Sequence, residues 1–164
     1  MKIRIPLTSA FFLLAGALIL PFFGHAEKVS GPGANWLVDF QQAQKKSAAE
    51  NKPIFLYFTG STWCPPCMLT EKEILLSKPF IEYSSRELIL VKADFSRSGE
   101  AMAKEHQEQH RQLYDTFADG FPTVALIAPD GKLIEKFTGY RAGGGEKFVV
   151  FIRNLIEEAG FGGA

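Results

Sequence analysis

The sequence predicts an α/β domain in which a mixed central β-sheet is flanked by helices on both faces. Short apolar runs alternate with longer segments whose apolar residues recur at helical spacing. Strands that are linked through helices run parallel, so this order favours a partly parallel sheet. Towards the C-terminus, two strand-like runs are joined by a turn at residues 129–132, which adds an antiparallel pair.

The first half of the domain is expected to contain a helix, a strand and a second helix. After a lead-in that contains Gly and Pro, Asn35 is expected to cap a helix that extends to about Glu50. The run Ile54–Phe58 is apolar throughout, as in a strand that is buried on both faces. The next helix is expected to begin at the cysteines and to reach about Leu76, since two prolines suit its first turn.

The second half continues this alternation and ends in a helix after a flexible run of three glycines. In chain order, the expected elements are a loop or short helix over 77–86, a strand over 88–95, a polar helix capped by Ser98 and reaching Phe117, strands over 123–128 and 133–138, and a last helix over 146–159.

The N-terminus is expected to be a signal peptide rather than part of this domain. A basic start precedes an uncharged apolar stretch over residues 10–23, and Gly24 and Ala26 occupy the −3 and −1 positions of a cut. The stretch is shorter than the roughly 20 residues that span a membrane, although an uncleaved anchor is an alternative. We therefore expect a signal peptide over 1–26 and an exported, periplasmic domain over 27–164.

The composition of the expected mature chain restricts its partners. Its 138 residues suffice for one compact domain with a sizeable core, and we expect a monomer. It carries 16 basic and 18 acidic residues, a net charge of −2, without a basic stripe. Nucleic acid is therefore not an expected partner.

The two cysteines of the chain, Cys64 and Cys67, form a CxxC pair at the expected start of a helix. One alternative is a structural disulfide, but such a small loop removes little entropy from the unfolded chain. The other alternative is half of a zinc site, but tetrahedral zinc needs four ligands, usually two such pairs. The spacing is better explained by redox chemistry, in which the pair passes electrons to and from other disulfides.

The motif Trp63-Cys64-Pro65-Pro66-Cys67 after the first expected strand, with Gly120-Phe121-Pro122-Thr123 before the hairpin, resembles the thioredoxin fold. The resemblance covers about residues 34–159. With the preceding segment Lys52–Ser61, the chain is similar to exported bacterial thioredoxin-like proteins. It is also similar to the C-terminal periplasmic domain of the membrane thiol reductase of the Dsb system.

This resemblance implies a thiol–disulfide oxidoreductase that acts on protein disulfides and needs no metal or organic cofactor. Pro122 would be cis and would line a substrate groove together with Trp63 and Phe121; a plain turn proline and a core tryptophan are the alternatives. A membrane redox partner would reset the active-site disulfide. A reductase is favoured, while an oxidase or isomerase, or a non-catalytic chaperone for copper or cytochrome assembly, is the alternative.

The chain departs from the family at two positions. Phe58 stands six residues before Cys64, where thioredoxin carries a buried carboxylate. Phe121 is larger than the usual residue before the cis-proline, which touches the substrate. The glutamate of the Dsb reductase domain is matched by Glu71, four residues after Cys67, although a solvated helix carboxylate is the alternative for Glu71.

The residues also predict separate roles for the two cysteines and Glu71. Cys64 is expected to attack as a thiolate, which the positive end of the helix favours. Cys67, one turn further on, would resolve the mixed disulfide, and a partly buried Glu71 on the same face would accept its proton.

His106 and His110 lie four residues apart in a polar helix and would suit a metal ion. The surrounding charged and amide residues favour a solvated helix face instead.

Overall fold

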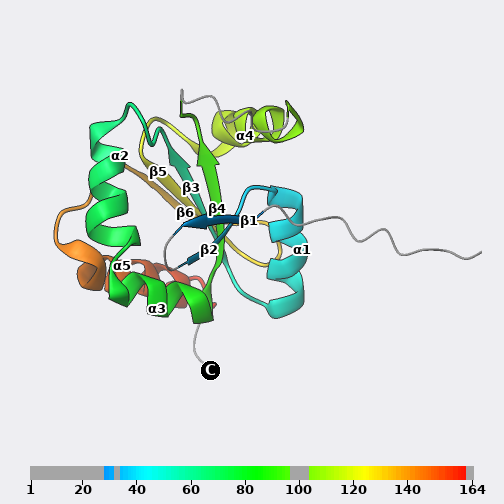
Figure 1. The fold of residues 1–164 in the computed structure, drawn as a ribbon. Helices are drawn as coiled ribbons and strands as arrows, with labels where there is room; N and C mark the ends of the chain where they lie inside the picture. Colours follow the sequence, from blue (N-terminus) through cyan, green and yellow to red (C-terminus); the bar gives the residue numbers. More distant parts are fainter. Residues whose placement is uncertain (1–27, 32–33, 97–103, 162–164) are drawn as a thin grey trace, which may run out of the picture.

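The computed structural model describes residues 28–31, 34–96 and 104–161, and within them six strands form one sheet in the order β1-β2-β4-β3-β5-β6 (Figure 1). The strands are β1 Lys28–Gly31, β2 Ala34–Leu37, β3 Ile54–Thr59, β4 Ile89–Asp94, β5 Thr123–Ile127 and β6 Leu133–Thr138. The neighbours β2, β4 and β3 run parallel, whereas β1, β5 and β6 join antiparallel. The predicted mixed sheet is confirmed.

Helices cover both faces of this sheet (Figure 1). They are α1 Phe40–Glu50, α2 Pro65–Thr70, a π-helical turn η1 Glu71–Leu75 that continues α2, α3 Lys78–Glu87, α4 Lys104–Phe117 and α5 Gly144–Glu158. One core layer packs η1, α3 and α5 on the sheet, and a second packs α1 and α4 on its other face. The predicted thioredoxin-like arrangement of helices on both faces is therefore present.

Strand β3 separates the two core layers, and all six of its residues are buried. Tyr57 points into the layer of η1, α3 and α5, while Phe58 points into the layer of α1 and α4. This alternation follows from the period of two in a strand. The same alternation determines which polar groups can contact each face of β3 near the end of the strand.

The prediction that Asn35 caps the first helix is wrong. Residues 34–37 form β2, where Trp36 and Leu37 point into opposite core layers, as strand geometry requires. The helix begins at Phe40, and Asp39 caps it by accepting hydrogen bonds from the backbone of Gln41 and Gln42 at 2.8 and 3.3 Å. Apolar side chains at these positions suit a helix and a strand equally well, so the pattern alone does not distinguish the two structures.

Of the loop and the short helix that were expected over 77–86, the structure has the helix, α3, and the glycine run that was expected to be a flexible break is part of a helix as well. Ser77 accepts a hydrogen bond from the backbone of Phe80 and caps α3. The glycine run starts α5. A β-carbon at Gly145 would lie 1.7 Å from the Ser77 hydroxyl, so only glycine fits at this position. Gly145 thus permits a close approach of two helices rather than a flexible break. Ser98, the expected cap of α4, lies outside the described residues.

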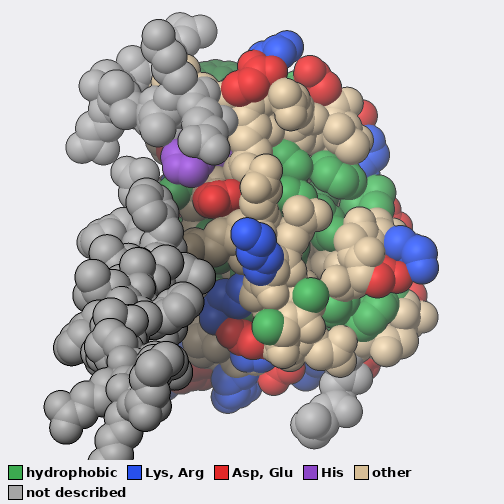
Figure 2. All heavy atoms as spheres, turned by 90° about the vertical axis from the view of Figure 1, so that its right-hand side faces the viewer, with side chains coloured by type: hydrophobic (Ala, Val, Ile, Leu, Met, Phe, Trp, Pro, Cys, Tyr) green, Lys and Arg blue, Asp and Glu red, His purple; other side chains and the backbone are tan. Residues whose placement is uncertain are grey.

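The face of the molecule that α1 and α4 form carries acidic and basic side chains side by side (Figure 2). Within the part of the chain that the structure describes, no helix has the length and apolar character needed to cross a membrane.

Candidate active site

Cys64 and Cys67 are joined by a disulfide at the amino end of α2, immediately after the turn that follows β3. Cys64 is the N-cap residue, and its carbonyl accepts hydrogen bonds from the backbone of Cys67 and Met68 at 3.0 and 3.1 Å. Cys67 is fully buried, whereas Cys64 is 4% exposed. Of the two sulfurs, the one on Cys64 is therefore the one that a substrate can reach.

The turn before the cysteines is fixed to the end of β4. Asp94 accepts hydrogen bonds from the backbone of Ser61 at 3.1 Å and of Ser96 at 3.0 Å. The indole of Trp63 donates to the carbonyl of Phe95 at 2.8 Å. These contacts hold the loop and the first cysteine in one position relative to the sheet.

Gly60 makes the position of Trp63 possible. A β-carbon at Gly60 would lie 2.3 Å from the indole ring, so the ring rests directly on the backbone of that glycine. Gly60 carries no signal of this role in the sequence, because only the folded turn shows that the ring covers it.

Trp63 lies at the surface, 37% exposed, and not in the core. Its ring meets Phe121 edge to face, with centroids 5.2 Å apart. Phe121 in turn stacks on Tyr114 of α4 at 4.9 Å and contacts Phe95 at 5.3 Å. The structure thus brings together two of the residues that were predicted to line the groove.

The Phe121–Pro122 peptide bond is cis, as the resemblance implied. Pro122 immediately precedes β5, and the first residue of that strand, Thr123, pairs with Phe58 near the end of β3. The cis-proline loop and the cysteine motif therefore sit at the same edge of the sheet.

Phe58 is fully buried and packs against Tyr114, with ring centroids 5.9 Å apart. The carboxylates of this site lie on the other face of β3. Glu71 forms an ion pair with Lys92 at 2.8 Å, and Lys92 lies 3.9 Å from Asp94. The hydroxyl of Thr59 donates to Glu71 at 3.4 Å.

The three charged side chains of this group are only 21–27% exposed. Glu71 is therefore a partly buried, ion-paired carboxylate and not a freely solvated one. Lys92 was missed by the sequence analysis, because a lysine near the end of a strand gives no sign of its partner. Its place opposite Tyr57 in the parallel register of β3 and β4 puts it beneath α2.

Tyr57 connects this group to the second cysteine. Its buried hydroxyl donates to the carbonyl of Cys67 at 3.3 Å. Burial, together with the negative charges of Glu71 and Asp94, raises the pKa of Tyr57 far above its usual value. The phenol therefore stays protonated and serves as a hydrogen-bond donor under the site.

The prediction of a solvated face at His106 and His110 is wrong for His110. That ring is 2% exposed, its Nε2 lies 2.9 Å from the carbonyl of Val38, and it contacts Phe95. Burial lowers the pKa of His110. Among the described residues, no group of three or more His, Cys, Asp or Glu side chains could hold a metal ion.

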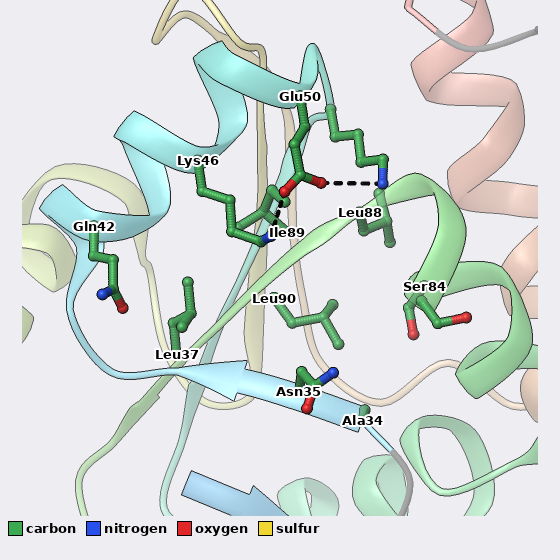
Figure 3. A pocket seen from close by; sticks show the side chains of 12 residues that line it. Ala34, Asn35, Leu37, Gln42, Lys46, Glu50, Ser84, Leu88, Ile89 and Leu90 are labelled. Atoms are coloured by element: carbon green, nitrogen blue, oxygen red, sulfur yellow. Dashed lines mark hydrogen bonds and ion pairs between the residues drawn. The ribbon is translucent and has the colours of Figure 1, made fainter. Parts of the chain in front are cut away.

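A pocket of about 320 Å³ lies at the opposite end of the sheet, where β4 begins (Figure 3). Lys46 and Lys52 at its rim both pair with Glu50, so their charges are matched within the pocket wall. Its lining contains neither cysteine. This pocket is therefore separate from the redox site, which lies at the other end of β4.

Comparison with known proteins gives the class of this chain. A family model described as a thioredoxin-like domain matches residues 40–150, so the chain belongs to the thioredoxin-like family. The solved structure of DsbH oxidoreductase superposes with a TM-score of 0.72 at 25% identity, covering 82% of this chain and 92% of that one. The oxidised C-terminal domain of DsbD from Neisseria meningitidis, with a TM-score of 0.50 and 19% identity over 71% of this chain and 92% of its own, shares the fold.

Two relatives from Chlamydia pneumoniae narrow the class. The disulfide bond reductase DsbH is 28% identical over 118 residues, which are 72% of this chain and 70% of DsbH. The thioredoxin-related protein DsbJ is 33% identical over 79 residues, 48% of this chain but 23% of DsbJ. With its disulfide pair, the chain is a thioredoxin-like thiol–disulfide oxidoreductase.

Proposed function

We propose that the chain is an exported reductase of protein disulfides. The observation that carries this proposal is the position of the Cys64–Cys67 disulfide, at a helix start and at the same edge of the sheet as Trp63 and the cis-proline loop. The name of the relative DsbH, a disulfide bond reductase, supports the reducing direction.

In the proposed reaction, the Cys64 thiolate attacks one sulfur of a substrate disulfide. A bond forms between the two sulfurs as the substrate's own S–S bond breaks, and the other substrate sulfur leaves as a thiolate. Cys67 then loses its proton, attacks Cys64 and releases the second substrate sulfur. The protein dithiol is oxidised to the disulfide seen in the structure, and the substrate disulfide is reduced to two thiols.

We assign the proton of Cys67 to Glu71. The carboxylate lies four residues beyond Cys67 on the continuous helix formed by α2 and η1, and the backbone N–H of Glu71 bonds to the carbonyl of Cys67. Lys92 and Thr59 hold the carboxylate in place. A partly buried carboxylate in this position is suited to act as a general base.

Substrates would bind in a groove formed by Trp63, Phe121 and Pro122. The aromatic contact between Trp63 and Phe121 makes this wall rigid, because Phe95 and Tyr114 support Phe121 from behind. No metal or organic cofactor takes part in the proposed exchange, since the two thiols supply both electrons.

We further propose that residues 1–26 are removed on export and that residues 27–164 form the mature protein. A cut after Ala26 falls two residues before β1, so it leaves the described fold whole. Outside the cytoplasm, a membrane redox partner would return electrons to the oxidised pair. N-terminal sequencing of protein recovered from the periplasm tests the cut, and an intact Met1 there would argue for an anchor.

The reductase proposal is tested by insulin reduction in a dithiol-coupled assay and by the equilibrium potential against glutathione. We expect activity that Cys64→Ser abolishes, and a potential near that of thioredoxin, about −270 mV. Full activity of Cys64→Ser would refute the proposed nucleophile. A potential near −120 mV would instead indicate an oxidase.

A further inference from the structure

The outer face of α2 carries an exposed apolar strip that the groove described above does not include. Pro65, Met68 and Leu69 recur at the i, i+3 and i+4 spacing that places side chains on one face of a helix. All three are exposed, and Met68 and Leu69 are each 42% accessible. We call these three residues the α2 strip.

Among the described residues, the large exposed apolar side chains are concentrated in the stretch of sequence that contains the two cysteines. Of the six large apolar side chains that are exposed in the described part of the chain, four fall between residues 63 and 76. No charged residue occurs from Thr59 to Thr70. Exposed apolar surface that is gathered in one place marks a binding site more often than scattered apolar residues do.

We infer that the α2 strip binds the segment of a substrate protein that flanks its disulfide, and that this segment is uncharged and carries a bulky apolar side chain. The inference rests on the proposed function. The exchange places a substrate sulfur on Cys64, which immediately precedes the strip, so the substrate chain must lie against the residues that border this cysteine. The strip offers that chain apolar contacts and no charge to pair with.

The length of the α2 strip limits which residue of the substrate it can contact. From Pro65 to Leu69 the helix rises about 6 Å, which corresponds to about two residues of an extended chain. Beyond the strip, the exposed neighbours Lys72 and Glu73 carry opposite charges and end the neutral surface. The recognised side chain is therefore expected within about two residues of the reacting cysteine of the substrate.

The test uses the reduced protein and a set of disulfide peptides that differ only in the two residues on each side of the cysteine: Leu, Ser, Asp or Lys. A small disulfide without side chains, bis(2-hydroxyethyl) disulfide, serves as the reference. We expect kcat/KM for the Leu peptide to exceed that for the Ser peptide about tenfold, since each apolar contact contributes on the scale of its buried area. The protein is expected to reduce both the Asp and the Lys peptide more slowly than the Leu peptide. Between roughly 50 and 500 mM salt, the rate of reduction of the Leu peptide is expected to change less than twofold, because no charge pair steers its association.

Substitution separates the α2 strip from the redox chemistry. In the Met68→Ser/Leu69→Ser variant, the ratio of kcat/KM for the Leu peptide to that for the small disulfide is expected to fall about tenfold. The matched control is Leu133→Ser/Val150→Ser, because these side chains are 44% and 42% exposed and lie on β6 and α5. The control ratio should stay at the wild-type value.

Equal rates for the Leu, Ser, Asp and Lys peptides would overturn the inference, as would an unchanged ratio in the strip variant. A failure of the wild-type protein to reduce even the small disulfide would overturn the proposed reductase function instead. The two failures are therefore distinguishable in one experiment.

Discussion

The ion pair between Lys92 and Glu71 allows a quantitative test of how the site is held together. An exposed pair contributes about 0–1 kcal/mol, whereas removing one partner of a buried pair costs about 3–5 kcal/mol. Lys92 and Glu71 lie between these cases, with 21% and 27% of their side chains exposed and 2.8 Å between the charged atoms. We therefore expect Lys92→Met to lower the free energy of unfolding by about 2 kcal/mol.

A double-mutant cycle isolates the pair from other effects of the substitution. Glu71→Gln keeps the size of the side chain and an acceptor for Thr59, and Lys92→Met in that background should cost only about 1 kcal/mol, since Asp94 remains 3.9 Å from the ammonium. The coupling energy is thus about 1 kcal/mol. Urea denaturation with the disulfide intact measures all four proteins.

The surface pair of Lys78 and Glu82 provides the control, because its side chains are 84% and 57% exposed. Lys78→Met should cost less than about 0.5 kcal/mol. If Lys92→Met costs no more than this control, or if the cycle shows no coupling, then the pair does not fix Glu71.

The same variants test the chemistry. If Lys92 acts by holding Glu71 under Cys67, then either single substitution slows the resolution of a mixed disulfide on Cys64, and the double variant is no slower than Glu71→Gln. Stopped-flow measurement of thiol release reports this step. If the rate in the double variant falls by the product of the two single-variant factors, then the two residues act independently.

Three further substitutions have defined outcomes. Gly60→Ala should displace the Trp63 indole, change the tryptophan fluorescence and lower the free energy of unfolding by about 2 kcal/mol. In a Trp63→Ala background the same substitution should be nearly neutral, and an equal cost in both backgrounds would exclude the ring contact. His110→Gln tests pH dependence. Burial lowers the pKa of His110, so below about pH 6.5 the unfolded chain binds a proton that the folded chain does not. Between about pH 7.5 and 5.5, the free energy of unfolding of the wild type, measured with urea, should therefore fall by roughly 1 kcal/mol more than that of the variant. Asp39→Ala should cost about 1–2 kcal/mol through loss of the cap, whereas Asn35→Ala should cost less than about 0.5 kcal/mol, and the reverse order would restore Asn35 as the cap.

From β3 onward the sequence was sufficient for the order of the strands and for most of the helices, because most runs there have one clear period, although it left a loop or a short helix open for residues 77–86. It was insufficient between residues 28 and 40. Trp36, Leu37 and Phe40 lie on one helical stripe, but in the sheet the first two face opposite layers. Only pairing with β4, more than fifty residues away in the chain, decides between these structures.

The candidate site divides in the same way. The cysteines and the loop around Pro122 lie within short contiguous motifs, so local spacing identified them. Lys92 and Gly60 matter through contacts with Glu71 and the Trp63 ring, which are formed only on folding. His110 was misjudged for a related reason, since its polar neighbours in sequence do not show that the carbonyl of Val38 and the ring of Phe95 cover it.

The replacement of a strand carboxylate by Phe58 has a structural consequence beyond the loss of one charge. Phe58 faces α4, where Tyr114 packs between it and Phe121, so aromatic contacts run from the core to the ring of Trp63. A carboxylate at position 58 would lie in that apolar layer, away from Lys92. Glu71 instead reaches the site from the start of η1, directly after α2, on the opposite face of β3, where a lysine, a threonine and a second carboxylate accompany it. The two faces of one strand therefore carry separate tasks: the α4 face supports the wall of the substrate groove, and the α2 face holds the group that we assign to the proton of Cys67.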